Sequence, residues 1–295
     1  MTTFKTVLLI GAGGNLGVPV LNEFLNSPYK VSILARKEST SKFPEGVPVF
    51  KADYTDIEAV QAAMEGQDVV ISMVGGIAAG DQQVFIDAAL AAGVKRFFPS
   101  EFGPYSRGTA FAELNPWVLP HKTAMVDYLR SKESQMSWSS LVTGAFFDWA
   151  MKTDFFGFDI ATKTVDLIDD GTSIFTSTTL PTIAKAVRLM LDNAEMTKNQ
   201  YVFVSSFNVS IRDILESVEK ITGEKWTVTH LKSEDVIEQG RKMLAGGDFT
   251  GIKLLTRGGA FGKRALGDER GHGLWNDKLK LPKDDMEQVL REILQ

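Results

Sequence analysis

The stretch KTVLLIGAGGNLGVPVLNEFL, Lys5–Leu25, decides the fold that this sequence predicts. Apolar and β-branched residues run from Thr6 to Ile10 and lead directly into a glycine-rich turn at residues 11–17. Apolar residues then recur at helical spacing as far as Leu25. A strand, a glycine turn and a helix in this order are typical of a dinucleotide-binding site. The alternative is a glycine-rich turn that binds no ligand.

The spacing of the glycines in this turn suits a pyrophosphate. Gly11 permits a tight exit from the strand, Gly14 lets the backbone approach the phosphates, and Gly17 lets the helix pack against the sheet. Free backbone N–H groups and the positive end of the helix then face the anion. The residues predicted to contact the cofactor here are Gly11, Ala12, Gly13, Gly14, Asn15, Leu16 and Gly17.

Basic residues after the second predicted strand favour NADP over NAD. Arg36 and Lys37 stand where a carboxylate would accept from the ribose hydroxyls of NAD, and Lys42 follows closely. A guanidinium can bind a phosphate with two hydrogen bonds. Asp53 is positioned to meet the adenine amino group, or else it is a turn residue, and Val74 after the fourth strand completes the predicted cofactor contacts. The alternative for the basic residues is a solvated surface loop.

Beyond the turn, short apolar runs alternate with helical patterns as far as residue 142. Continuous apolar strands such as VVISMV indicate burial on both faces, as in a parallel sheet covered by helices. This alternation predicts an α/β, doubly wound Rossmann-type fold. The predicted strands are Thr6–Ile10, Lys30–Leu34, Val47–Lys51, Val69–Met73, Arg96–Pro99 and Ser139–Val142, and the predicted helices are Leu16–Leu25, Ile57–Met64, Gln82–Ala92 and Thr123–Ser131.

After residue 150 the alternation loosens. We therefore predict an NADP-binding domain at residues 1–150 and a smaller α/β lobe at 151–295, which covers the substrate and returns some elements to the main sheet. Within it, Ser210 and Asp213 form a capping-box pattern that opens a helix. The glycine- and charge-rich segment 256–273 is interpreted as a loop.

Composition narrows the function classes. The chain has 295 residues, 44% of them hydrophobic and 23% charged, as in ordinary globular proteins. It has no cysteine and only three histidines without ligand spacing, so no metal site is expected. The net charge of −5 argues against general nucleic-acid binding, and no apolar run is long enough to span a membrane. We expect a soluble, cytoplasmic protein.

Several motifs together resemble one known family. They are GAGGNLG at 11–17, Arg36, ADYTD at 52–56, DVVISMVG at 68–75 and, most specifically, DQQVFIDAALAAGVKRFFPSEFG at 81–103. The chain is similar to the isoflavone reductase-like branch of the atypical short-chain dehydrogenases, within the NmrA-like family. The similarity is strong from residue 6 to about residue 149 and looser afterwards. It implies a Rossmann-type fold, NADPH, and reduction of aromatic, phenylpropanoid- or isoflavonoid-like small molecules by hydride transfer.

The resemblance also singles out Lys122. Ordinary short-chain dehydrogenases use a Tyr-x-x-x-Lys pair, but the residue four positions before Lys122 is Val118, so the tyrosine is missing. In the isoflavone reductase-like branch the lysine alone is the proposed general acid/base. Lys122 could also bond the nicotinamide ribose, or it could be a solvated lysine without a role. His121 is a second candidate for proton transfer.

The helical pattern around Lys122 is compatible with a catalytic lysine. Met125, Val126 and Leu129 share a helix face with Lys122 through i+3 and i+4 spacing. This face would pack against the sheet and hold the lysine at the edge of a partly apolar cleft. Loss of solvent there lowers the pKa of an ammonium group toward a useful range.

An aromatic-rich run is the candidate substrate wall. TGAFFDWAMKTDFFGF, residues 143–158, holds six aromatic residues among sixteen, just after the sixth predicted strand. Such residues line a pocket for a flat substrate or form a core between two lobes. Asp148 among them either orients a substrate hydroxyl or caps a helix. After the fifth strand, Ser100 and Glu101 lie where ligands bind, although Glu101 is more simply an anchor of its turn. The predicted substrate contacts are Phe102, Phe146, Phe147, Asp148 and Trp149.

Two functions from different classes follow from these features. The first is an NADPH-dependent reductase of a small aromatic substrate, with Lys122 as the general acid/base and a homodimer as one possible assembly. The second is an NmrA-like regulator that senses NADP(H) without catalysis and acts through a protein partner. The missing tyrosine is compatible with both functions.

Overall fold

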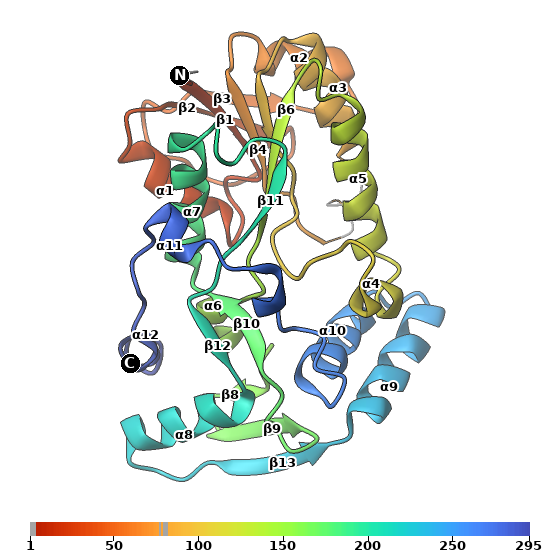
Figure 1. Ribbon diagram of the computed structural model, residues 1–295, viewed down its shortest axis with the longest axis vertical. Coiled ribbons are helices and arrows are strands. Elements are labelled where there is room, and N and C mark those ends of the chain that lie inside the picture. Colours follow the sequence, from red (N-terminus) through yellow and green to blue (C-terminus); the bar gives the residue numbers. More distant parts are fainter. Residues whose placement is uncertain (1–3, 77, 79–81) are drawn as a thin grey trace. The chain divides into compact units, whose positions relative to one another are not determined.

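The computed structural model describes residues 4–76, 78 and 82–295 (Figure 1). The chain forms two compact units. The first unit comprises Met1–Phe102, Val118–Val142 and Ile183–Val202. The second unit comprises Gly103–Trp117, Thr143–Thr182 and Phe203–Gln295. The division therefore departs from a single boundary at residue 150, because residues 103–117 join the second unit and residues 183–202 return to the first.

A seven-stranded sheet is the centre of the first unit, with the strand order β11-β6-β5-β4-β1-β2-β3. The pairings that join β1 to β2 and β4, β2 to β3, β4 to β5 and β5 to β6 are all parallel. The strand order reverses beside β1, which is where doubly wound proteins bind ligands. The strands are β1 (Thr6–Ile10), β2 (Lys30–Arg36), β3 (Val49–Ala52), β4 (Val69–Ser72), β5 (Arg96–Phe98), β6 (Ser137–Val142) and β11 (Gln200–Phe203). The predicted doubly wound fold is confirmed.

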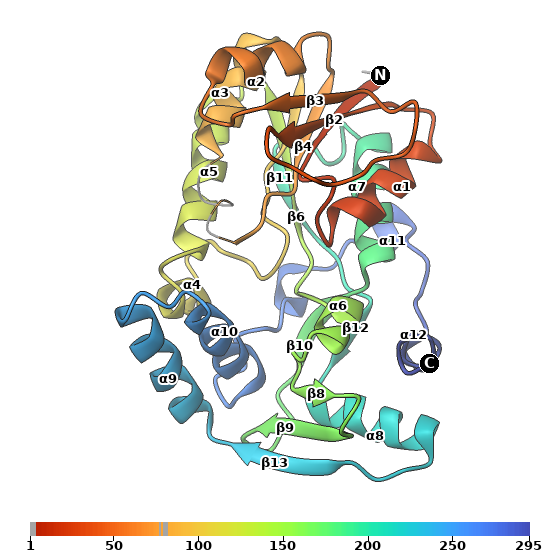
Figure 2. The ribbon, with the colours of Figure 1, turned by 180° about the vertical axis from the view of Figure 1, so that it is seen from behind.

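Helices cover both faces of this sheet. α1 (Gly17–Leu25) and α7 (Leu180–Asp192) lie on one face, and α2 (Ile57–Met64), α3 (Gln83–Ala91) and α5 (Leu119–Ser131) lie on the other (Figures 1 and 2). All four residues of β4 are buried, as expected for a strand covered on both sides. Beneath α2, α3 and α5, a core cluster includes Leu8, Val70, Phe97 and Trp138.

The second unit contains two three-stranded sheets with the orders β12-β10-β7 and β13-β9-β8. Its strands are β7 (Ala145–Phe146), β8 (Phe158–Asp159), β9 (Thr164–Ile168), β10 (Phe175–Thr178), β12 (Phe207–Val209) and β13 (Thr227–Leu231). Its helices are α4 (Ala110–Leu114), α6 (Phe147–Lys152), α8 (Ile211–Thr222), α9 (Ser233–Ala245), α10 (Gly251–Phe261), α11 (Asn276–Leu279), α12 (Met286–Ile293) and the 3₁₀ turn η2 (Arg270–His272). The predicted capping box of Ser210 and Asp213 opens α8, so this prediction is confirmed.

The prediction of a loop at 256–273 is wrong in its first part, because α10 continues to Phe261. Glycines of α10 serve close packing against α9 rather than a turn. A Cβ on Gly258 would lie 2.7 Å from Ile237 Cγ1 in α9, and a Cβ on Gly251 would lie 2.5 Å from the carbonyl oxygen of Gly240. Such contacts join residues that are distant in sequence, so the local sequence pattern does not reveal them. Locally, glycine disfavours a helix.

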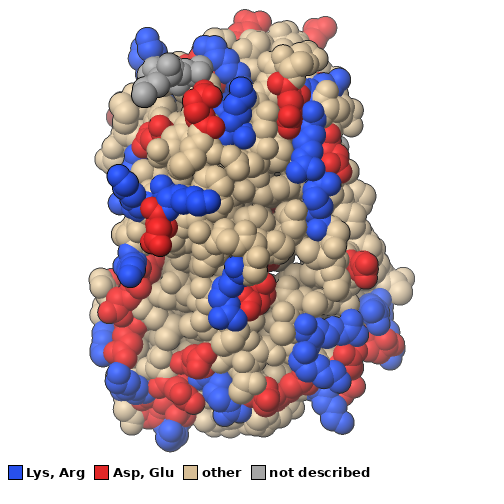
Figure 3. Space-filling model, viewed as in Figure 1, with Lys and Arg blue, Asp and Glu red and all other residues tan. Residues whose placement is uncertain are grey.

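Surface charge on the face drawn in Figure 3 is mixed in sign, with lysine and arginine interspersed among aspartate and glutamate. Across the described ranges, no helix is long and apolar enough to cross a membrane. The same residues contain no group of three or more histidine, aspartate or glutamate side chains that could hold a metal ion.

Candidate cofactor site and the surroundings of Lys122

The turn between β1 and α1 requires glycine at two positions. Gly11 has a φ of +82°, and a Cβ there would lie 2.8 Å from the carbonyl oxygen of Met73. A Cβ on Gly17 would lie only 2.1 Å from the carbonyl oxygen of Gly11. The N–H group of Gly14 donates to that same oxygen at 3.0 Å, which closes the turn. The turn therefore brings the end of β1 and the start of α1 into direct backbone contact.

The open side of the turn is formed by backbone. Gly13, Gly14 and Asn15 are exposed, whereas the side chains of Ala12 and Leu16 are buried. Any ligand placed over this turn would therefore meet peptide groups first, as a phosphate requires. This arrangement fits the pyrophosphate of a dinucleotide.

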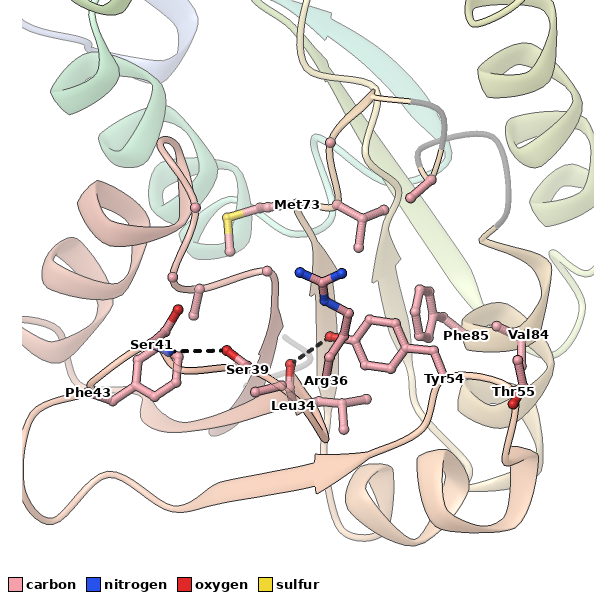
Figure 4. Close-up of a pocket in the computed structure, with 18 residues that line it drawn as sticks. Leu34, Arg36, Ser39, Ser41, Phe43, Tyr54, Thr55, Met73, Val84 and Phe85 are labelled. Carbon is pink, nitrogen blue, oxygen red and sulfur yellow. Dashed lines mark hydrogen bonds between the residues drawn. The ribbon is translucent and has the colours of Figure 1, made fainter. Parts of the chain in front are cut away.

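A cavity of about 450 Å³ opens beside the turn, entirely within the first unit (Figure 4). Its volume falls in the range of small-molecule sites. Residues of the glycine turn form one wall. Arg36, Ser39, Ser41, Tyr54 and Phe85 contribute further side chains.

Arg36 is the cation of this cavity. It ends β2, is exposed, and extends its guanidinium into the cavity in Figure 4. Among the described residues, the guanidinium has no hydrogen bond or ion pair to another side chain. The N–H group of Ser39 donates to the carbonyl oxygen of Arg36 at 2.9 Å, and that of Ser41 donates to Ser39 Oγ at 3.3 Å. A guanidinium and two hydroxyl groups therefore lie on one short loop, a donor set that suits a phosphate.

Ser41 also lies against the glycine turn. A Cβ on Gly13 would be 2.3 Å from Ser41 Oγ and 2.7 Å from Ser41 Cβ. The loop after β2 is therefore packed onto the turn.

Some predicted cofactor residues do not line the cavity. Lys37 and Lys42 are exposed outside it. The carboxylate of Asp53 accepts from Thr55 N at 2.9 Å and from Thr55 Oγ1 at 2.7 Å, and these bonds lower the pKa of Asp53. This geometry matches the alternative that Asp53 is a turn residue. Val74 does line the cavity, and its carbonyl oxygen accepts from Ser100 Oγ at 2.7 Å.

Sequence reasoning missed the aromatic wall of the cavity. The rings of Tyr54 and Phe85 meet edge to face, with centroids 4.8 Å apart. Both residues belong to quoted motifs, Tyr54 to ADYTD and Phe85 to the motif at 81–103, but only the fold brings Phe85 of α3 beside Tyr54. Burial raises the pKa of Tyr54 to about 12, so this side chain is neutral at physiological pH.

Lys122 lies on the buried face of α5, together with Leu119, Val126 and Leu129. Only 8% of its surface is exposed, so the side chain is not solvated. Its Nζ donates to the carbonyl oxygen of Phe102 at 3.1 Å. Burial lowers the pKa of Lys122, and the negative charge of Glu101 opposes that shift. His121, the preceding residue, is exposed.

The loop that bonds Lys122 is itself fixed. The N–H group of Ser100 donates to Gln82 Oε1 at 2.8 Å, while Ser100 Oγ donates to Val74. These bonds join the residues that follow β5 to those that follow β4. Lys122 of α5 therefore bonds a loop that hydrogen bonds hold in place after β5.

The predicted substrate residues other than Phe102 lie in the second unit. Phe147 is fully buried and packs against Phe156 and Phe207, at centroid distances of 5.8 and 4.8 Å, so its ring belongs to the core. Asp148 accepts from the N–H group of Leu180 at 3.1 Å, as in the helix-cap alternative, and burial raises the pKa of this carboxyl. Phe146 and Trp149 are partly exposed, and their contact with a substrate stays a prediction.

Comparison with known proteins identifies the family of this chain. The model of the NmrA-like family matches residues 3–247. The chain belongs to the NmrA-like family. This NmrA-like protein is 35% identical to the oxidoreductase aprR of Aspergillus flavus, over 98% of each chain. It is 27% identical to the isoflavone reductase homolog P3 of Arabidopsis thaliana, over 81% of this chain and 82% of that one.

A solved structure agrees with the fold of this NmrA-like protein along its length. AtPrR2 with NADP+ and (+)-pinoresinol has a TM-score of 0.82 and 19% sequence identity, over 99% of this chain and 100% of that one. The predicted isoflavone reductase-like branch is confirmed by these relatives, and the predicted oxidoreductase class agrees with them.

Proposed function

We propose that the protein is an NADP(H)-dependent oxidoreductase that reduces a small aromatic molecule, with Lys122 as the general acid. The observation that carries the proposal is the cavity lined by both the glycine turn and Arg36, whose guanidinium has no ion pair within the part of the chain that the structure describes. A dinucleotide with an additional phosphate could place its pyrophosphate at the glycine turn and the additional phosphate at Arg36. The family membership and the oxidoreductase aprR support the reaction class.

The residues present fit NADP(H). The peptide groups of residues 11–14 would hold the pyrophosphate, since Gly13 and Gly14 are exposed and lack side chains. Arg36, with Ser39 and Ser41, would hold the 2′-phosphate. Tyr54 and Phe85 would contact the adenine. When bound, NADPH supplies the hydride.

Lys122 would then provide the proton. Its buried Nζ is oriented by the carbonyl oxygen of Phe102 and is shielded from water. Because burial lowers its pKa, an ammonium at this place releases a proton more readily than a solvated lysine does. An aromatic substrate is supported by the similar solved structure, which is that of AtPrR2 with NADP+ and (+)-pinoresinol.

Cofactor discrimination tests the proposal directly. We expect Arg36→Ser to weaken NADPH binding by about 10- to 100-fold, because it removes charge-assisted hydrogen bonds to a phosphate. Binding of NADH, which lacks that phosphate, should change little. Titration calorimetry with both cofactors measures the two affinities.

Lys37→Ser is the matched control, since it removes the same charge from the next residue, which lies outside the cavity. Equal losses in the two variants would contradict a specific role for Arg36. Oxidation of NADPH in the presence of a panel of phenylpropanoid-like aromatics tests catalysis. Tight NADP+ binding without turnover of any compound would favour the NADP(H)-sensing regulator instead.

A further inference from the structure

A second cavity lies within the second unit and shares no residue with the cofactor cavity. It has a volume of about 530 Å³ and is lined by side chains from residues 151–166 and by Arg257 of α10. We call it the Arg257 cavity. The family motifs quoted above lie outside residues 151–166, and only the aromatic run 143–158 overlaps this segment.

Arg257 is a buried cation that has no direct partner among residues 4–76, 78 and 82–295. Only 7% of its surface is exposed. Its Nε and Nη2 are buried and have no hydrogen-bond acceptor, and no carboxylate among the described residues forms an ion pair with it. Burial lowers the pKa of Arg257, while Asp166 and Asp154 oppose this shift only through space. Leaving a buried guanidinium without hydrogen bonds is costly, so its retention calls for an acceptor.

The backbone is shaped around this side chain. Gly157 has a φ of +93°, and a Cβ there would lie 2.7 Å from Arg257 Nη2 and 2.7 Å from the carbonyl oxygen of Asp166. Only glycine leaves room for the guanidinium at this point. The N–H group of Asp166 donates to the carbonyl oxygen of Gly157 at 3.0 Å, which fixes the segment that faces Arg257.

The charges of the cavity restrict the ligand. Lys152 adds a second cation to the lining. Of the three aspartates, Asp154 is paired with Lys253 at 2.5 Å and Asp159 accepts from Thr162 N at 3.1 Å. These carboxylates would repel a dianion such as phosphate more strongly than a singly charged group.

Part of the remaining lining is apolar and suits the carbon skeleton of an organic ligand. Ile160, Ala161 and Phe158 line the cavity, beside the hydroxyl-bearing Thr153 and Thr164. A planar guanidinium matches the geometry of a carboxylate. We propose that the Arg257 cavity binds a small organic monocarboxylate, with its carboxylate on Arg257 and its apolar part against these residues.

Binding to the full-length protein tests this proposal, with benzoate and butyrate as probes and inorganic phosphate for comparison. Titration calorimetry and ligand-observed NMR should detect both carboxylates at millimolar concentration and phosphate more weakly. Arg257→Met should weaken carboxylate binding at least tenfold. Arg264→Met is the matched control, because Arg264 is paired with Glu234 at 2.8 Å outside the cavity, and it should bind as the wild type does.

The thermal stability of the free proteins separates binding from folding. Arg257→Met should melt at or above the wild-type temperature without ligand, since it removes a buried charge without partners. Arg257→Lys keeps the charge but loses the planar guanidinium that can donate two parallel hydrogen bonds. This variant should bind carboxylate more weakly than the wild type. Three results would overturn the proposal: no carboxylate binding to the wild type, equal binding to Arg257→Met, or phosphate binding tighter than carboxylate. A large loss of stability in both variants would assign Arg257 a structural role instead.

Discussion

Lys122→Met is expected to lower kcat by about 10²- to 10⁴-fold while NADPH still binds. The substitution removes the only ionisable group of this side chain and keeps an unbranched chain that is one atom shorter. Because Lys122 is 8% exposed, the apolar methionine suits the buried position, although the carbonyl oxygen of Phe102 loses the hydrogen bond from Nζ. Steady-state oxidation of NADPH with any aromatic compound that the wild type reduces gives kcat, and calorimetry gives the cofactor affinity.

Lys132→Met provides the control for this substitution. Lys132 follows α5 directly and is partly exposed, with its ammonium over the ring of Tyr128, so its loss should leave kcat unchanged. A wild-type kcat in Lys122→Met would exclude the proposed general acid. A loss of NADPH affinity at constant kcat would instead assign Lys122 to cofactor binding alone.

The pH profile gives an independent test of the same group. A proton donor is active below its pKa, so kcat should fall as pH rises through the pKa of Lys122. A solvated lysine has a pKa of about 10.4. Because burial lowers the pKa of Lys122, the fall in kcat should begin at a pH below that of a solvated lysine. Glu101 favours the charged lysine, so Glu101→Gln should move the fall to still lower pH. A profile that Glu101→Gln leaves in place would contradict this coupling, provided that the variant melts as the wild type does.

Gly17→Ala is expected to destabilise the protein by about 3 kcal/mol, which corresponds to a decrease in melting temperature of roughly 6 °C or more. The added Cβ would lie 2.1 Å from the carbonyl oxygen of Gly11 and 2.6 Å from the carbonyl carbon of Ala12. Both contacts are with backbone, which cannot rotate away as a flexible side chain would. The turn must therefore open, and the affinity for NADPH should fall with it.

Differential scanning fluorimetry and cofactor titration measure these two effects. Gly271→Ala is the control, since no atom lies within 4 Å of a Cβ built there. A stable Gly17→Ala variant that binds NADPH normally would show that the turn tolerates a side chain. In that case the close approach of β1 and α1 is not required for the site.

The parts of the fold that follow from local chemistry could be predicted from the sequence. β1 and α2 have the predicted bounds, because a continuous apolar run and an amphipathic pattern bounded by turn residues specify them. The capping box of α8 was predicted from two residues, since Ser210 and Asp213 satisfy each other's backbone groups. Helix α5 begins at Leu119, four residues before its predicted start, because Pro120 is tolerated in a first helical turn.

The predicted cofactor residues that line the cavity all stand at or just after the ends of recognisable strands. Residues 11–14 of the glycine turn and Arg36 are contiguous with recognisable strands and line the cavity, whereas the predicted contacts Asn15, Leu16 and Gly17 do not line it. Ser41 and Phe85 reach it from a loop and a helix whose positions depend on tertiary packing. The aromatic run 143–158 was ambiguous for a similar reason, since hydrophobicity alone does not separate a core ring such as Phe147 from one that faces a ligand.

The close approach of Gly13 and Ser41 should couple the substitutions that evolution accepts at these two positions. Any side chain at residue 13 would displace the hydroxyl at residue 41, and with it the loop that follows Arg36. A substitution at residue 13 is therefore tolerable only on a background in which residue 41 has already become smaller. Among descendants of a common ancestor, the two positions should change as a pair, and cofactor preference should change along with them.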